Sequence, residues 1–117
     1  MSRALQIHVG EGIDAMTARA ADAWRRAERG EAVREDHLTF ETWETLARTL
    51  SGGRLELLSH LHRHPAASVA ELARRLNRDE ARVREDVAAL AAIGLLDEDA
   101  AGALSTEYDE LKAVITL

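Results

Sequence analysis

The stretch from Ser68 to Leu90 constrains the fold most tightly, because it contains signals for the start and the end of two helices. Ser68 and Glu71 form a capping-box pattern. The serine hydroxyl can accept from the backbone N–H three residues on, and the glutamate can reach back to the serine N–H. Asn77–Asp79 is a tight turn, and Asp79 is a suitable N-cap for a second, longer helix that runs to about Ile93. The sequence therefore predicts two helices that meet across a short turn.

Apolar residues recur at helical spacing through both predicted helices and mark the faces that should pack together. They are Leu72, Ala73, Leu76, Val83, Val87 and Leu90. Ala73 is small, which allows the two helices to cross closely. Gly94 supplies the left-handed residue that ends the second helix. Leu95 and Leu96 begin an extended segment, Asp97–Gly102 is a hairpin-like turn, and Leu104 begins the return.

This pattern resembles the winged helix-turn-helix of MarR-like and ArsR-like bacterial regulators. Those proteins show a valine-led first helix, then "LA..L", a turn, and "V...V..L...GL"; the match covers about residues 54–104. The whole chain is also similar to small prokaryotic transcriptional regulators that share "IHVG", "AW.RAERGE", "HLTFE.WE.L" and "R.ELL..L.RHP". Here these motifs occupy residues 7–10, 23–31, 37–46 and 54–65. The resemblance implies a sequence-specific DNA-binding regulator and, for some members, an antitoxin encoded beside a toxin.

The resemblance also implies which residues touch DNA. The first half of the second helix enters the major groove in such proteins. Arg82 and Arg84 are then placed to donate to guanine or to phosphate, and Arg78 in the turn to phosphate. Arg74, Arg75 and Ser68 are expected to meet the DNA backbone, the serine through a helix N-terminus. The predicted DNA-binding residues are thus Ser68, Arg74, Arg75, Arg78, Arg82 and Arg84.

Several acidic residues depart from the family pattern. Glu80, Glu85 and Asp86 lie on the helix that should read DNA, and Asp97–Asp99 forms the tip of the predicted wing. Many DNA-binding wings carry Arg or Lys there. We therefore expect that this wing does not enter the minor groove deeply, and that it could face a partner protein instead.

The charge distribution allows specific DNA binding but not strong nonspecific binding. The 117-residue chain has a net charge of −6. Residues 54–93 carry seven Arg and six acids, whereas residues 94–117 carry one Lys and six acids. Nonspecific affinity comes from neutralising phosphates, so a nearly neutral reading head must rely on a few arginines.

Composition excludes several other classes. There is no cysteine, so a disulfide scaffold is excluded. No stretch reaches the roughly 18 apolar residues of a membrane span, and no secretion leader is evident, so we expect a cytoplasmic protein. A Gly-rich phosphate loop, H-E-x-x-H and a nucleophile elbow are all missing from the sequence, so we expect neither an enzyme nor a bound cofactor.

The remaining patterns predict a mostly helical α+β chain, in which an N-terminal strand and two helices precede the winged helix-turn-helix. The expected elements are a strand over Ala4–Val9, a helix capped by Asp14 and running to Arg29, a polar connection over Glu31–His37, a helix capped by Thr39 and ended by Ser51–Gly53, a helix over Arg54–His62, and a last strand over Val114–Leu117. We divide the chain into residues 1–53 for dimerisation, 54–104 for the winged helix-turn-helix, and 105–117 as a tail with a short strand.

Double-stranded DNA and a second copy of the chain are the expected partners, because two-fold operators match two-fold proteins. The alternative is a protein-interaction module, such as the antitoxin that binds a cognate toxin.

Two side interpretations, a metal site and a ligand pocket, are weaker. His60 and His64 share a helical face in the manner of a zinc pair, but no third ligand is evident and we expect no metal. Trp24, Phe40 and Trp43 could line a ligand pocket, but they suit a core or a dimer interface better.

Overall fold

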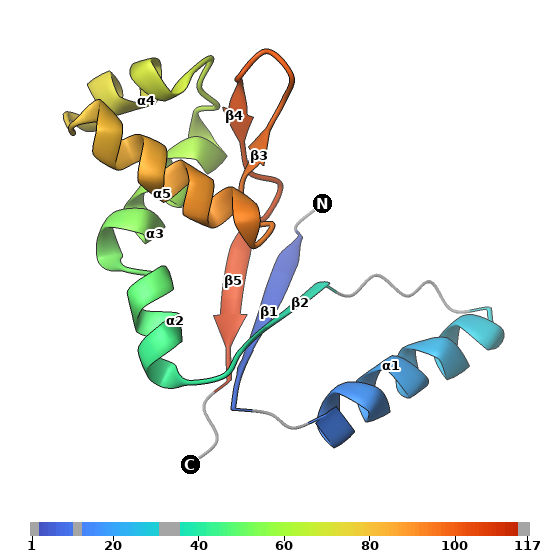
Figure 1. Cartoon of the computed structure of the whole chain (residues 1–117). Coiled ribbons are helices and arrows are strands. Elements are labelled where there is room, and N and C mark those ends of the chain that lie inside the picture. Colours follow the sequence, from blue (N-terminus) through green and yellow to red (C-terminus); the bar gives the residue numbers. More distant parts are fainter. Residues whose placement is uncertain (1–2, 11–12, 31–35, 115–117) are drawn as a thin grey trace.

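The computed structural model describes residues 3–10, 13–30 and 36–114, and it has an α+β architecture (Figure 1). Strands and a helix alternate in the first part of the chain, and four helices in succession then precede a hairpin and a last strand. The elements are β1 (Ala4–Val9), α1 (Ile13–Glu28), β2 (Asp36–Phe40), α2 (Trp43–Thr49), α3 (Gly52–Arg63), α4 (Val69–Leu76), α5 (Glu80–Ala92), β3 (Asp97–Glu98), β4 (Leu104–Ser105) and β5 (Glu110–Ala113).

The first and last strands of the described chain lie side by side in one sheet. β1 is the central strand, with β2 on one side and β5 on the other, and both pairings are parallel. The register places Ile7 beside Leu38 of β2 and beside Ala113 of β5. Since neighbours in register point to the same face, the apolar side chains of the strands gather on one side of the sheet.

Charged residues close the end of this sheet at which β1 begins. The Arg3 guanidinium donates to the Asp36 carboxylate at 2.9 Å and lies 5.0 Å from the centre of the Tyr108 ring. It also forms an ion pair with Glu107. The hydrogen bond to Asp36 raises the pKa of Arg3 above its ordinary value. Burial raises the pKa of the Tyr108 hydroxyl. These contacts connect the N-terminal strand to both of its neighbours.

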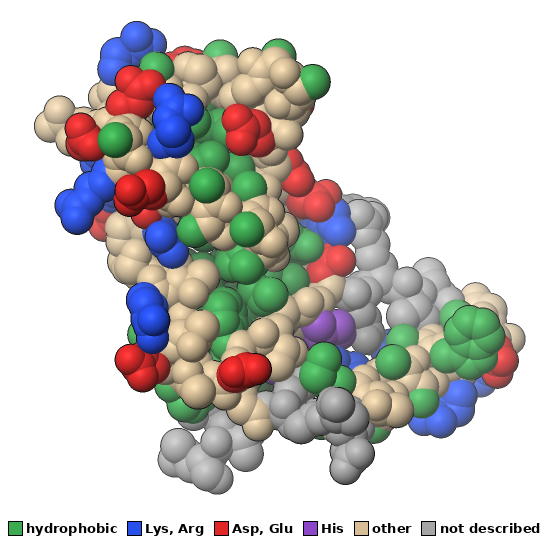
Figure 2. Space-filling model, in the orientation of Figure 1, with side chains coloured by type: hydrophobic (Ala, Val, Ile, Leu, Met, Phe, Trp, Pro, Cys, Tyr) green, Lys and Arg blue, Asp and Glu red, His purple; other side chains and the backbone are tan. Residues whose placement is uncertain are grey.

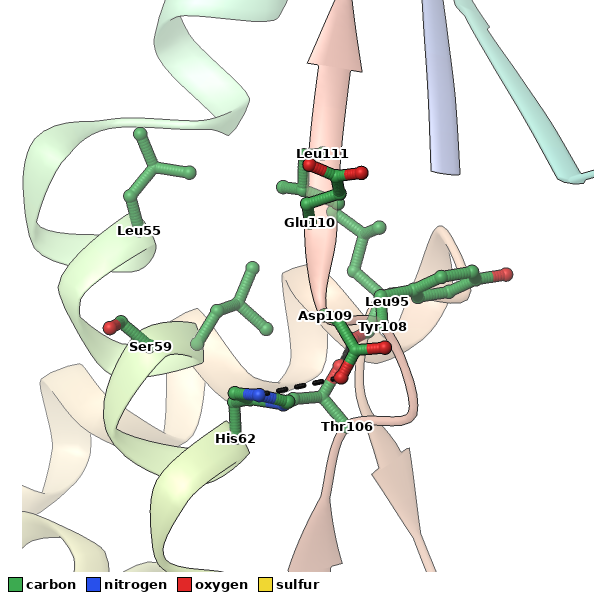
Figure 3. Close-up of a pocket in the computed structure, with 10 residues that line it drawn as sticks. Leu55, Ser59, His62, Leu95, Thr106, Tyr108, Asp109, Glu110 and Leu111 are labelled. Carbon is green, nitrogen blue, oxygen red and sulfur yellow. Dashed lines mark hydrogen bonds and ion pairs between the residues drawn. The ribbon is translucent and has the colours of Figure 1, made fainter. Parts of the chain in front are cut away.

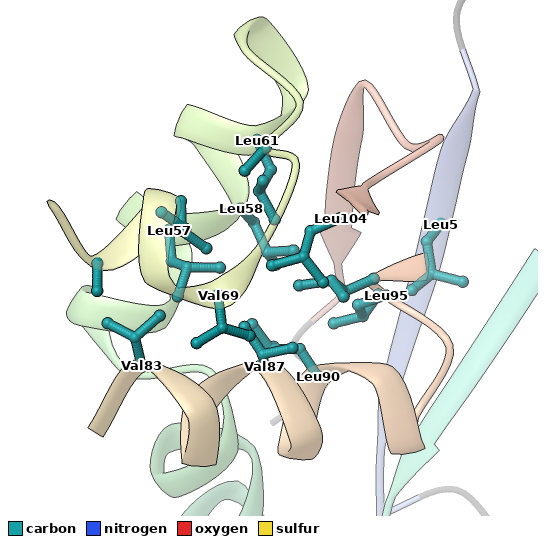
Figure 4. Packing of buried hydrophobic residues seen from close by; sticks show 14 of the residues in the cluster. Leu5, Leu57, Leu58, Leu61, Val69, Val83, Val87, Leu90, Leu95 and Leu104 are labelled. Carbon is teal, nitrogen blue, oxygen red and sulfur yellow. The ribbon is translucent and has the colours of Figure 1, made fainter. Parts of the chain in front are cut away.

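The core lies between α3, α4, α5 and the hairpin (Figure 4). Its most deeply buried side chains come from each of these elements and are Leu57, Leu61, Leu72, Val83, Leu90, Leu95 and Leu104. The hairpin strands β3 and β4 are antiparallel. Ala66, just before α4, exchanges two backbone hydrogen bonds with Leu104, of 2.7 and 3.0 Å. The hairpin is therefore joined to the segment between α3 and α4.

The turn between α4 and α5 forms as the sequence predicts. Asn77 has φ 54°, the left-handed conformation that a short polar side chain tolerates. The Arg78 N–H donates to the Ala73 carbonyl at 3.0 Å, which closes the end of α4. Asp79 then caps α5, because its carboxylate accepts from the Arg82 N–H at 3.1 Å. Gly94 has φ 82° and ends the same helix, as predicted.

The prediction was wrong between residues 36 and 53. Thr39 does not cap a helix but lies in β2, where Leu38 and Phe40 extend the apolar face of the sheet. The cap of α2 is Thr42, whose hydroxyl accepts from the Thr45 N–H at 3.2 Å. Ser51 does not merely end α2. Its side chain caps α3, so the two glycines that follow belong to the first turn of that helix.

Smaller corrections apply at both ends of the chain. α1 begins at Ile13, so Asp14 lies inside the helix rather than at its cap. The last strand is Glu110–Ala113, because its register is set by pairing with β1, and residues 115–117 lie outside the described part of the chain. The strand over Ala4–Val9 is confirmed. Of the expected polar connection, residues 31–35 are also outside the described part.

Among the described residues, no helix combines the length and the apolar composition needed to cross a membrane. The radius of gyration is 16.2 Å, against about 13 Å for a compact domain of this length. Figure 1 shows the cause, because α1 stands apart from the other helices at the far side of β2.

Leu61 and Leu55 on α3 provide a matched test of this core. Leu61 is fully buried, whereas Leu55 is 43% exposed. Leu61→Ala should lower the free energy of unfolding by about 2–5 kcal/mol, because it leaves a cavity at the centre of the cluster. Leu55→Ala should cost less than about 1 kcal/mol by the area it buries. Urea unfolding of both variants measures the difference. Equal losses in the free energy of unfolding would contradict the burial of Leu61, and not Leu55, in the core.

Candidate nucleic-acid interface

The residues predicted to bind DNA lie together on α4, the turn and the first half of α5. Figure 2 shows Lys and Arg side chains over this part of the molecule, at the upper left, interspersed with Asp and Glu. The surface is therefore mixed in charge rather than uniformly basic. Which of these arginines is available depends on the acid that each one contacts.

Ser68 and Arg75 take part in a local network at the start of α4. The Ser68 hydroxyl accepts from the Glu71 N–H at 3.1 Å, as the capping box predicts. The Glu71 carboxylate accepts from the Ala67 N–H at 2.8 Å rather than from the Ser68 N–H. Arg75 forms an ion pair with Glu71 and donates to the Pro65 carbonyl at 3.2 Å. Both residues therefore stabilise this helix terminus.

Arg78 connects the turn to the first turn of α3. Its guanidinium donates to the Gly53 carbonyl and to the Glu56 carboxylate, both at 2.8 Å. The side chain is 27% exposed and lies over Gly53, where a Cβ would be 3.6 Å from Nη1. Sequence reasoning gave Arg78 a phosphate contact, but the partners of Arg78 are far from it in sequence and no local pattern indicates them. Its geometry fixes α3 against the turn.

A second long-range pair removes an acid from the exposed face of α5. Arg54 of α3 donates to the Asp86 carboxylate at 3.0 Å and to the Thr49 carbonyl at 3.1 Å. The two charged side chains are 22% and 24% exposed. Helical i,i+4 spacing would also allow Asp86 to pair with Arg82, but the carboxylate is directed to Arg54 instead. The sequence spacing could not distinguish the two partners.

Arg74 and Arg82 are exposed arginines of the predicted DNA-binding set. Within the described residues, neither guanidinium has a hydrogen bond or an ion pair with protein. Arg74 lies in the last turn of α4 and Arg82 in the first turn of α5, on either side of the Asn77 turn. Arg84 contacts Glu80 at 3.0 Å, but both side chains are more than half exposed, so this pair is weak.

The acidic hairpin is ordered by one of its own carboxylates. The Asp99 carboxylate accepts from the Ala101 and Ala103 N–H groups, both at 2.9 Å, and so closes the turn. Asp97 and Glu98 are exposed on β3. No cation of the described chain contacts these two carboxylates. The hairpin tip therefore presents negative charge.

The histidines of α3 do not assemble a metal site. His60 and His64 are neighbours, with ring centroids 5.5 Å apart, as their spacing predicts. His62 points the other way, toward the Asp109 carboxylate at 3.5 Å. Burial and the adjacent His64 lower the pKa of His60, which favours its neutral form. Across the described ranges, no three potential ligand side chains come together.

With this geometry in place, comparison with known proteins identifies a family. A family model described as HVO_A0114 matches residues 49–113, which is more than half of the chain, so the chain belongs to this family. The match begins at the end of α2 and runs through α5 and the hairpin to β5. No curated protein and no solved structure matches the chain significantly.

The contacts of Arg78 and Arg82 predict different effects of their removal on stability. Arg78→Ala should lower the free energy of unfolding by about 1 kcal/mol, because it removes two hydrogen bonds of a charged donor that is partly screened. Arg82→Ala should change it by less than about 0.5 kcal/mol, since that side chain has no hydrogen bond or ion pair within the described part of the chain. Urea unfolding of both variants tests this, and an unchanged stability for Arg78→Ala would show that its contacts contribute nothing.

Proposed function

We propose that residues 54–104 form a winged helix-turn-helix and that this protein is a sequence-specific DNA-binding transcriptional regulator. The observation that carries the proposal is the pair α4 and α5, joined by the left-handed Asn77 turn. An exposed arginine on each side of this turn has no partner among the described residues. α5 is the longer helix, and in this proposal the hairpin that follows it serves as the wing.

In this account the first half of α5 enters the major groove. Arg82 and Arg84 read bases there, because a guanidinium can donate to guanine O6 and N7 together. The Arg84–Glu80 pair is exposed, so exchanging the carboxylate for a base costs little. Arg74 contacts the phosphate backbone from the end of α4. Arg78 and Arg75 support the helices rather than the DNA, since both already have protein partners.

The acids of this region favour selectivity over strong general affinity. Asp86 and Glu56 are paired with Arg54 and Arg78, so they are neutralised close to the α5 surface. Few cations remain to displace counterions, and the salt dependence of binding should be shallow. Specific binding by one small reading head is weak, which favours a dimer on a two-fold operator. A dimeric repressor of its own operon is the role we assign.

The exposed carboxylates of the hairpin favour a second function. Asp97 and Glu98 have no cationic partner among the described residues and would repel phosphate. They suit a basic protein surface, as an antitoxin presents to its toxin. The two functions are compatible, because DNA would contact α5 and the partner would contact the hairpin.

The DNA-binding proposal is tested by replacing one arginine at a time. Arg82→Ala should weaken binding to a duplex from the protein's own upstream region by about 1–3 kcal/mol, or roughly 5- to 150-fold in Kd, and relax base preference. Arg48→Ala is the control, because Arg48 is an exposed arginine of α2 that pairs with Glu44 on the same helix. Gel-shift titrations at several salt concentrations give both quantities. Equal affinities for Arg82→Ala and Arg48→Ala would reject α5 as the reading helix.

A further inference from the structure

An apolar stripe on α1 is exposed along the length of the helix. It consists of Met16, Ala20, Trp24 and Ala27, which recur every three or four residues and so share a face. Met16 is 43% and Trp24 69% exposed. The Trp24 indole N–H donates to the Glu28 carboxylate at 2.7 Å within the same helix, so the ring needs no further polar partner. Figure 2 shows hydrophobic side chains at the surface of α1, at the right of the view.

An apolar groove lies on the opposite side of the sheet, between β5 and helices α2 and α3. Two adjoining hollows of about 300 and 250 Å³ form it, and they share Leu55 and Leu111. The first is lined by Trp43, Leu46 and Ala47 of α2, with Ile7 of β1 beneath. The second runs between α3 and β5 toward His62 and Asp109 (Figure 3). We call the two together the β5 groove.

From these two features we infer that two copies of the chain associate reciprocally, with the α1 stripe of each copy seated in the β5 groove of the other. This inference gives the interface of the dimer that the proposed function requires. Only the role of the dimer, binding to a two-fold operator, rests on the proposed function. The α1 of the same chain lies beyond β2, whereas the groove lies beside β5 at the other edge of the sheet (Figure 1).

The exposed area of the single chain supports a second copy as the occupant. Its accessible surface is 7775 Å². A compact monomer of 12.9 kDa has about 6,300 Å². The excess of about 1,500 Å² exceeds the roughly 800 Å² that each partner buries in a standard stable interface.

The charges that flank the two surfaces are also complementary. The last turns of α1 carry Arg25 and Arg26. The segment that leads into the groove carries Glu107, Asp109 and Glu110, of which Glu107 pairs with Arg3 and Glu110 with Lys112, so one net negative charge remains there. A helix end of net positive charge would thus meet a strand of net negative charge. This favours contact of α1 with the β5 groove over contact of α1 with a second α1.

The chain has no cysteine, so any disulfide that forms between two introduced cysteines reports a contact between those two positions. Ala20→Cys marks the stripe, and Ala47→Cys marks the groove. Mixing the two single variants under mild oxidation should give a disulfide-linked dimer, whereas each variant alone should not. Ala88→Cys on the exposed face of α5 replaces Ala47→Cys in the control mixture and should give no link. Dimers of Ala20→Cys alone, or no link in the mixture, would overturn the reciprocal arrangement.

A solution measurement checks the same interface without a cross-link. Trp24→Glu should weaken dimerisation at least tenfold in sedimentation equilibrium, because it places a charge in the groove. Ala18→Glu adds the same charge on the polar face of α1 and should leave the dimer intact. Arg82→Ala should dimerise as the unaltered chain does, so loss of DNA binding and loss of the dimer are separable. A dimer that tolerates Trp24→Glu contradicts the inference.

Discussion

The packing of α3, α4 and α5 depends on the left-handed turn at Asn77. It connects α4 to α5 within three residues, so that Ala73 and Val83 are both buried in one core cluster. Arg78, the next residue, then fixes this turn to the start of α3 through Gly53 and Glu56. The exposed face of α5 is thereby held in one orientation relative to the rest of the core. A surface that reads DNA needs this, because base contacts demand fixed geometry.

Charge pairing decides how that surface can act. Arg54 directs the Asp86 carboxylate away from the exposed face of α5, and the Glu56 carboxylate is occupied by Arg78. Arg74 and Arg82 are left without protein partners in the described chain. A formal charge close to zero over residues 54–93 therefore conceals available guanidinium groups, among them those of Arg74 and Arg82. Pairing within the fold, rather than the sum of charges, determines which cations a ligand can reach.

Local signals in the sequence identified the elements whose boundaries depend on neighbouring residues. Ser68 and Asp79 cap the helices they were expected to cap, and Gly94 ends α5. The elements whose boundaries depend on distant partners were missed. β2 and β5 exist because β1 lies between them, and Thr39 has no local feature that distinguishes a strand from a helix cap.

The candidate site divides in the same way. The positions of Arg82 and Arg84 on the first half of α5 follow from the Asp79 cap and the helical repeat. The partners of Arg78 and Asp86 lie on α3, more than twenty residues away in sequence, so spacing on one helix could not indicate them. Sequence therefore predicted where these arginines lie on the helices, while the structure showed which of them have protein partners.

Selection of bound duplexes from a pool of random sequence tests the central claim, sequence-specific DNA binding, most directly. The account predicts enrichment of an inverted repeat whose half-sites contain guanine, with centres about 10 base pairs or a multiple of that apart. Recovery of unenriched sequences under conditions in which the protein is folded would contradict it.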